Sequence, residues 1–172
     1  MTILKELLYL FEAKEKNLIG LTISGKLITE KTPSEPWPDN FNCYNNKLTS
    51  LQGAPNDVGG YFGCFSNKLT SIQGAPTSVG VDFNCSDNDL TSLQGIHKIL
   101  KKMNGTFYAH DNHIKSHVIG LMLVQGCKKV RLDNKQVEEI MNKYLPNTTG
   151  NRGLLDCQGD LIDAGFGDYA EL

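Results

Sequence analysis

The side chains of this sequence that could most readily do chemistry are its histidines. His110, His113 and His117 lie close together, and the His110-x-x-His113 spacing is one that a metal ion can use. The surrounding pattern, however, predicts that His110 faces outward from a strand, that His113 follows a turn residue and that His117 begins a helix. Since the three rings then need not converge, we expect solvated histidines, no metal site and no cofactor.

Cysteine is the second candidate for chemistry. The chain has five cysteines, Cys43, Cys64, Cys85, Cys127 and Cys157. The first three occupy one position of a repeat, which predicts a ladder of reduced, buried thiols. Neither Cys127 nor Cys157 has a histidine at a spacing typical of an activated thiolate. The sequence also lacks a phosphate-binding loop, a nucleophile elbow and a zinc pattern, so we expect that the protein is not an enzyme.

A tandem repeat predicts the elements that position these side chains. The first copy reads Phe-Asn-Cys-Tyr-Asn-Asn-Lys-Leu-Thr-Ser-Leu-Gln-Gly-Ala-Pro from Phe41, and similar copies begin at Phe62 and Phe83, a period of 21 residues (62 − 41 and 83 − 62). Such a period, with an asparagine and apolar residues at fixed offsets, is typical of a solenoid in which each copy forms one turn. Two further strand patterns, at 107–109 and 130–132, continue the series after an insertion.

Each copy begins with a segment, Phe-x-Cys, that alternates as a short strand does and points phenylalanine and cysteine inward. The asparagines of the next bend, Asn46, Asn67 and Asn88, are predicted to bond backbone groups that the bend leaves unpaired, as a stacked ladder. Trp37 lies in a proline-rich connection before the first copy. It is either a plug of the core or sheet edge, or a binding residue.

The segments on either side of the repeat are predicted to close its ends. Residues 3–14 carry the apolar stripe of an N-terminal capping helix, and 21–28 match the apolar offsets of a degenerate first turn. After the last strand, Asp133 is predicted to cap one helix, and a second begins near residue 153. We therefore divide one continuous structural domain into a cap (1–20), a solenoid (21–133) and a C-terminal helical cap (134–172).

Two further helices are predicted inside the repeat region, at 96–103 and 117–125, from their apolar periodicity. The last helix of the chain is expected to carry four apolar residues and to end at Gly165. The four are Leu154, Leu155, Leu161 and Ile162.

Composition restricts the partners. The chain has 172 residues with 17 basic and 19 acidic side chains, a net charge of −2, and its basic cluster at Lys98, Lys101 and Lys102 is small. Nucleic-acid binding is therefore not expected. No apolar run approaches the ~20 residues that span a membrane, so we expect a soluble, cytoplasmic protein that does not act at a membrane.

The repeat resembles the leucine-rich repeat. Phe-x-Cys-x-x-Asn-x-Leu-Thr-Ser-Leu follows the family pattern Leu-x-Leu-x-x-Asn-x-Leu, and Leu-Thr-Ser-Leu-Gln-Gly-Ala-Pro is similar to leucine-rich-repeat proteins of bacteriophages with short bacterial-type repeats. The resemblance is specific over 41–95. It implies an α/β solenoid with a short parallel concave β-sheet that binds proteins, and it carries over no catalytic residue. It also implies a phage factor in the host cytoplasm that inhibits or redirects a host protein, including a defence protein.

The outward strand positions vary between copies, unlike the core positions, and they are the candidate partner-binding residues. They are Tyr44, Tyr61, Phe65, Asp82, Asn84, Tyr108, His110 and Arg131. Aromatic residues exposed on a sheet are enriched at interface hot spots, and the bland interpretation is that they only cover a thin sheet. The leading hypothesis is a non-enzymatic module that binds another protein. The alternative is an enzyme or small-molecule sequestering protein with a pocket between the last strands and the C-terminal cap, near His110, Asp111 and Arg131.

Overall fold

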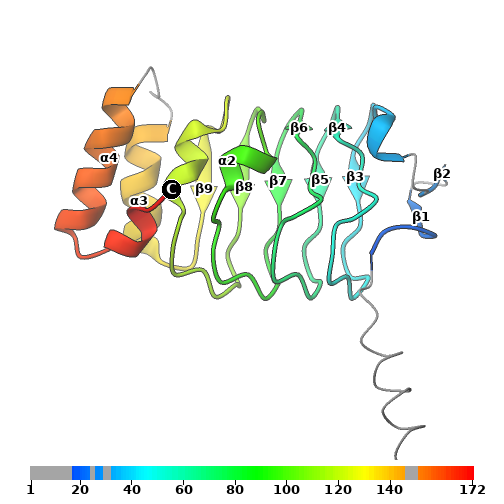
Figure 1. The fold of residues 1–172 in the computed structure, drawn as a ribbon, viewed down its shortest axis with the longest axis horizontal. Helices are drawn as coiled ribbons and strands as arrows, with labels where there is room; N and C mark the ends of the chain where they lie inside the picture. The colour runs from blue at the N-terminus through cyan, green and yellow to red at the C-terminus, as the bar shows by residue number, and fades with distance from the viewer. Residues whose placement is uncertain (1–16, 24–25, 29–31, 146–150) are drawn as a thin grey trace, which may run out of the picture.

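The computed structural model describes residues 17–23, 26–28, 32–145 and 151–172 and has a mixed α/β architecture (Figure 1). Its main sheet has five parallel strands in the order β3-β5-β7-β8-β9. Their bounds are Phe41–Asn42 (β3), Phe62–Gly63 (β5), Phe83–Asn84 (β7), Thr106–Tyr108 (β8) and Lys129–Arg131 (β9). Among the described residues the α-helices are Ile96–Ile99 (α2), Lys135–Tyr144 (α3) and Asn151–Asp163 (α4).

The register of the main sheet stacks equivalent residues of successive copies. Phe41 pairs with Phe62, Phe62 with Phe83, and Phe83 with Phe107. The centroids of these neighbouring rings lie 5.6, 5.0 and 5.0 Å apart, and all four rings are fully buried. Cys43, Cys64 and Cys85 are also fully buried and free. The predicted inward set is therefore confirmed, and it leaves the alternate side chains for the opposite face.

The predicted asparagine ladder is present at the bend after each strand. The Asn67 side chain donates to the carbonyl oxygens of Cys64 (2.9 Å) and Cys43 (3.1 Å), and its Oδ1 accepts from the amides of Asn46 and Leu48, both at 2.9 Å. Asn88 and Asn112 repeat this arrangement one and two turns further on. Each side chain thereby joins two turns, because it serves backbone groups of its own bend and of the preceding one.

A second parallel pairing joins β4 (Asp57–Val58) to β6 (Ser78–Val79) along another edge of the molecule (Figure 1). Isolated bridges extend it to Trp37 on one side and to Lys102 and Gln125 on the other. Each paired valine is followed by a glycine for a steric reason. A Cβ atom at Gly80 would collide with the carbonyl oxygen of Gly59. Glycine therefore allows successive backbones to approach closely.

Trp37 is a core plug, as the first of its two interpretations held. Its side chain is buried, its Nε1 donates to the carbonyl oxygen of Asn40 (3.2 Å), and its ring meets Phe41 edge-on at a centroid distance of 5.0 Å. A short 3-10 helix, η1 (Thr32–Ser34), precedes it.

The predicted first turn is wrong in its strand pairing. Instead of joining the parallel sheet, β1 (Thr22–Ile23) pairs antiparallel with β2 (Lys26–Leu27) as a separate two-stranded sheet. Ile23 and Ile28 are nevertheless buried, so the apolar offsets identified core residues while the backbone closed locally on itself. The helix predicted at 3–14 lies outside the described residues.

The two helices predicted inside the repeat region are shorter than expected. The segment 96–103 is helical only as α2, because Leu100 is extended and the amides of Lys101 and Lys102 bond the carbonyl oxygen of Thr77. Within 117–125 the structure has a 3-10 helix, η2 (Ile119–Leu123). In both places the chain leaves the helical conformation to form a parallel β-bridge with the neighbouring turn, at Lys102 and at Gln125. Pairing between turns therefore outweighs the local helical periodicity.

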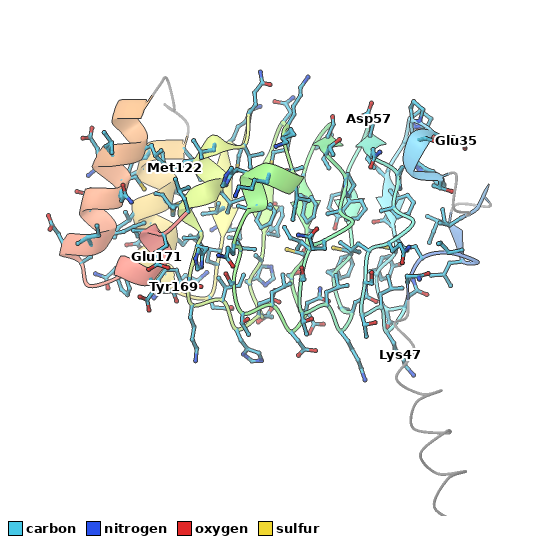
Figure 2. The ribbon with its side chains drawn as sticks, viewed as in Figure 1. Glu35, Lys47, Asp57, Met122, Tyr169 and Glu171 are labelled. Atoms are coloured by element: carbon cyan, nitrogen blue, oxygen red, sulfur yellow. The ribbon has the colours of Figure 1, made fainter. Side chains whose placement is uncertain are left out.

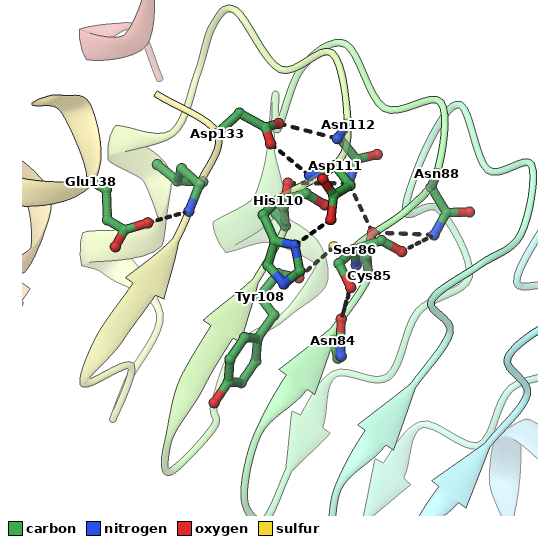
Figure 3. Close-up of polar contacts among 12 residues, drawn as sticks. Asn84, Cys85, Ser86, Asn88, Tyr108, His110, Asp111, Asn112, Asp133 and Glu138 are labelled. Atoms are coloured by element: carbon green, nitrogen blue, oxygen red, sulfur yellow. Dashed lines mark hydrogen bonds and ion pairs between the residues drawn. The ribbon is translucent and has the colours of Figure 1, made fainter. Parts of the chain in front are cut away.

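The helix α3 closes the open edge of β9 with side chains. Asn142 accepts from the Val130 amide (2.7 Å) and donates to the Val130 carbonyl (3.0 Å), while Glu138 accepts from the Leu132 amide (2.8 Å). The N-cap of α3 is Asn134, whose Oδ1 accepts from Gln136 and Val137, so the predicted Asp133 cap is wrong by one residue. Asp133 instead accepts from the amides of Asp111 and Asn112 and ends the asparagine ladder (Figure 3).

The last helix, α4, packs on α3 and is followed by a 3-10 helix, η4 (Gly167–Ala170). Leu161 is buried, and the thiol of Cys157 lies 3.7 Å from the Met141 sulfur. Leu155 and Ile162 are 63% and 54% exposed. Within the described residues no helix has the length and apolar character that a membrane crossing requires.

Candidate functional site: the outer face of the parallel sheet

The outer face is the surface of the main sheet opposite the phenylalanine stack. It has three rows that cross the strands, built from the position before each core phenylalanine (Val130 in β9), the position after it, and the position two residues further on. The rows are Asn40, Tyr61, Asp82, Thr106 and Lys129; Asn42, Gly63, Asn84, Tyr108 and Arg131; and Tyr44, Phe65, Ser86, His110 and Asp133. All eight predicted site residues thus lie on one face.

The most prominent apolar feature of the outer face is the pair formed by Tyr44 and Phe65. Their rings stack with centroids 4.6 Å apart and planes inclined by 8°. Tyr44 is 50% exposed, although it belongs to an aromatic residue type that usually covers or fills apolar space. The register places the two side chains on neighbouring strands, so exposed Tyr44 and partly buried Phe65 form one continuous aromatic surface.

Tyr61 lies across the middle of the face. A Cβ atom at Gly63 would come within 2.6 Å of Asn42 Oδ1 and 2.9 Å of the Tyr61 hydroxyl oxygen, so glycine leaves the space that this ring occupies. Burial raises the pKa of the Tyr61 phenol above its ordinary value, and a hydrogen bond with the Asn84 side chain opposes that rise. Tyr61 is therefore half-buried and held in place, unlike Tyr44.

Asp82 and Asn84 have structural bonds on the same face. Asp82 Oδ1 accepts from the Thr106 amide (2.7 Å), and Asn84 Oδ1 accepts from the amide (2.9 Å) and hydroxyl (2.6 Å) of Ser86. Ser86 is itself buried. These residues shape the floor of the face more than they offer free groups to a partner.

Tyr108 and His110 project from the same side of β8 and the bend after it (Figure 3). Their rings meet edge-on with centroids 6.4 Å apart. His110 Nδ1 lies 2.7 Å from Asp111 Oδ2, and the two side chains are 40% and 71% exposed. The face thus carries a second aromatic pair, and the imidazole of this pair contacts the exposed Asp111 carboxylate.

Arg131 is directed toward the C-terminal cap. Its Nη1 donates to Glu138 Oε1 at 2.9 Å, and Lys135 Nζ lies 3.0 Å from Glu138 Oε2. Burial raises the pKa of the Glu138 carboxyl, but bonds from the Leu132 amide, Lys135 and Arg131 outweigh it and hold the pKa below its ordinary value. Arg131 therefore links the end of the sheet to α3, and it shares the Glu138 carboxylate with Lys135.

The three clustered histidines have different partners. His117 Nδ1 lies 2.8 Å from Ser116 Oγ and 3.1 Å from Ser92 Oγ, and its Nε2 lies 3.3 Å from Glu171 Oε2. His110 is paired with Asp111, and His113 is exposed. No group of three histidine, cysteine, aspartate or glutamate side chains in the described part of the chain could hold a metal ion.

The sequence did not indicate the network around His117. It docks the end of the chain, because the His117 amide donates to the Asp168 carbonyl (3.0 Å) and the Tyr169 hydroxyl donates to the Ile114 carbonyl (3.0 Å). Figure 2 shows Tyr169 and Glu171 close together beside the helical cap. These partners are about 50 residues apart in the sequence, so no local spacing could have indicated them.

The thiols have the properties of buried structural groups. Burial raises the pKa of Cys43, Cys127 and Cys157 to about 12, and it also raises the pKa of Cys64 and Cys85. The thiolate is therefore scarce near neutral pH, and these thiols are poor nucleophiles while the protein is folded.

Two grooves in the described structure lie away from the outer face. One of about 380 Å³ follows the β4–β6 edge, with Asp57, Ser78, Lys102 and Gln125 among its lining residues. The other, of about 310 Å³, is lined by the arc from Ser50 to Gly74. Neither includes His110, Asp111 or Arg131, the residues around which the alternative hypothesis placed a pocket.

This fold is a mixed α/β class with a five-stranded parallel sheet and helices at the β9 end. Comparison of the chain with protein-family models, with curated proteins and with solved structures finds no significant match.

Proposed function

We propose that the chain is a leucine-rich-repeat solenoid that acts as a non-enzymatic protein-binding module through its outer, concave face. Its partner is another protein, and the phage resemblance of the repeat makes a protein of the bacterial host cytoplasm, including a defence protein, the favoured class. Binding inhibits or redirects that protein.

The Tyr44–Phe65 stack, in which Tyr44 is exposed and Phe65 partly exposed, is the observation that carries this proposal. Two aromatic rings on neighbouring strands remain at the surface of a face whose opposite side is fully packed by four phenylalanines. Rigid aromatic side chains bury a large area on binding and lose little conformational entropy, which is why they dominate interface energetics. The core positions repeat almost unchanged, whereas the rows of the outer face differ from strand to strand.

The test is a retention experiment with the full chain immobilised in bacterial lysate. Changing Tyr44, Phe65 and Tyr108 together to alanine is expected to weaken binding by ~2–4 kcal/mol, since desolvated aromatic anchors typically lose that much on truncation. Melting should change little, because these side chains lie outside the core. A bound protein should be recovered by the wild type and lost by the variant.

The matched control changes Lys47 and Lys68 to alanine. Both are exposed on the bend beyond the strands, and Figure 2 shows Lys47 at the edge opposite Asp57. This variant should retain the partner. If the lysine variant lost the partner while the aromatic variant kept it, the binding site would lie off the outer face.

A further inference from the structure

We infer that the outer face selects protein segments in which an aromatic or aliphatic side chain is followed, about two residues along, by lysine or arginine. This inference rests on the proposed function and adds the chemistry of the partner. It follows from a division of the outer face into an uncharged aromatic half and an acidic half.

The β3–β5 half is aromatic, and no acidic residue directly follows either member of the aromatic pair. Tyr44 and Phe65 form the stack, and the residues that follow them are Asn45 and Ser66. Both adopt left-handed backbone conformations, with φ of 53° each, at the bend that ends the strand. An apolar side chain of a partner can therefore meet the stack without burying a charge beside it.

The β7–β8 half has carboxylates at the positions equivalent to Asn45 and Ser66. Asp87 and Asp111 follow Ser86 and His110, with φ of 52° and 54°, and the Asp87 amide donates to the His110 carbonyl at 3.0 Å. Both are exposed, and Asp89 is exposed two residues after Asp87. The two aspartates thus occupy stacked, equivalent bends.

The backbone does not require these negative charges. A left-handed bend favours asparagine and aspartate alike, and Asn45 and Ser66 occupy the equivalent bends with the same φ. Of the nearby basic side chains, Arg131 is bonded to Glu138, His110 lies beside Asp111, and Lys129 is exposed at β9. The acidic half presents exposed carboxylates at Asp87, Asp89 and Asp111 beside the aromatic half, and a cationic segment is the complementary partner.

The next row gives the surface a direction. It carries Lys47 and Lys68 beside the aromatic half and Asp89 beside the acidic half. A cationic group is therefore repelled from the end that holds the Tyr44–Phe65 stack and attracted to the other end. This arrangement places the apolar side chain of the segment over β3 and β5 and its cations over β7 and β8.

Strand spacing sets the distance between the two contacts. Phe65 follows β5 and Asp111 follows β8, two places further in the sheet order, which corresponds to about 10 Å at ~4.8 Å per strand. An extended peptide advances ~3.3 Å per residue. Successive side chains of an extended peptide point to opposite faces, so the next side chain that faces the sheet after the apolar one is the second following residue, ~6.6 Å along. A peptide that crosses the strands with its apolar side chain at the stack therefore brings this second residue between Asp87 and Asp111.

The experiment uses displayed random peptides of about 12 residues, long enough to cross the sheet, selected on the purified full chain. The matched variant is Asp87→Asn with Asp111→Asn, which removes charge and keeps a residue type already present at Asn45. The second variant is Tyr44→Ala with Phe65→Ala. Synthetic peptides of the enriched sequence are then titrated against all three proteins at low and high salt.

We expect enrichment of sequences with an apolar residue and a Lys or Arg about two positions later. Affinity should fall about tenfold or more in the asparagine variant and in the aromatic variant, and should fall with added salt for the wild type. Peptides that need the aromatic pair but bind the asparagine variant unchanged would overturn the inference and leave the proposed function standing. Absence of enrichment, or peptides that bind the aromatic variant as tightly as the wild type, would overturn the inference. Retention of the lysate protein by the aromatic triple variant would count separately against the proposed function.

Discussion

The repeated turns and the C-terminal end of the sheet both have backbone groups that side chains must hydrogen-bond, and the two regions use different residues to do so. In the repeated turns, one asparagine per copy bonds the backbone of two neighbouring bends, as Asn67 and Asn88 do. At β9 no further copy follows, and three residues at unrelated positions take over this role. Asp133 accepts from the Asp111 and Asn112 amides, while Glu138 and Asn142 bond the outer edge of β9 from the helix α3.

The difference shows how a repeating sheet can end. A free strand edge presents unpaired amides and carbonyls and can recruit another strand. Glu138 and Asn142 imitate a neighbouring backbone with a carboxylate and an amide, and the helix that carries them covers the edge. Periodic residues therefore hold the interior together, whereas single residues that no repeat predicts determine where the sheet stops.

The largest effect is expected inside the ladder. In Asn88→Ala, the amide of Leu69 loses its side-chain partner. The carbonyl oxygens of Cys64 and Cys85 each lose one of two asparagine donors, since Asn67 and Asn112 remain. Buried polar groups left unpaired cost ~1–3 kcal/mol each, so we expect a loss of roughly 2–4 kcal/mol in urea unfolding. Asn46→Ala is the control, because this more exposed asparagine donates only to the Cys43 and Tyr44 carbonyls among its resolved side-chain bonds. Equal losses would mean that the ladder does not couple the turns.

At the end of the sheet, Glu138→Gln should cost about 1–3 kcal/mol by weakening bonds to the Leu132 amide, Arg131 and Lys135. The pKa of the Glu138 carboxyl is lower in the folded than in the unfolded protein. Its stabilisation is thus present above the unfolded pKa, near 4.5, and is lost as pH falls through the folded pKa.

Urea unfolding of wild type and variant from neutral to acidic pH checks this prediction. The stability gap between them should narrow as the solution is acidified. Glu139→Gln is the control, because the side chain of Glu139 is exposed and its loss should matter by less than about 0.5 kcal/mol. A gap that stayed constant down to strongly acidic pH would show that the charge of Glu138 is not what stabilises the edge.

The smallest effect is expected in the cysteine ladder. Cys64→Ser should cost only about 1 kcal/mol, because a serine hydroxyl could keep the bond that the Cys64 thiol donates to the Asn84 carbonyl (3.4 Å). The next turn has Ala109 at the equivalent position, so the ladder does not demand sulfur. A thiol reagent should modify Cys43, Cys64 and Cys85 only on unfolding, and rapid modification of the folded protein would contradict their burial.

The repeat spacing predicted the strands from Phe41 to Val130, their inward phenylalanines and cysteines, the asparagine ladder and the common face of the eight candidate residues. These features depend on equivalent positions being stacked, which is a property that a fixed period expresses directly. The same reasoning was wrong at 21–28, where β1 and β2 pair antiparallel. It also overestimated the helices at 96–103 and 117–125, because pairing across turns competes with local periodicity.

Sequence alone therefore determined which side chains alternate between core and surface, since that depends on strand geometry and period. Only the tertiary structure decided what those side chains do there. It stacked Tyr44 on Phe65, tied Asp82 to Thr106, and turned Arg131 toward Glu138. It also brought His117 close to Glu171, and it placed Glu138 and Asn142 where they hydrogen-bond the backbone at the edge of β9. These contacts join residues from different elements, and their partners depend on three-dimensional packing that no local periodicity encodes.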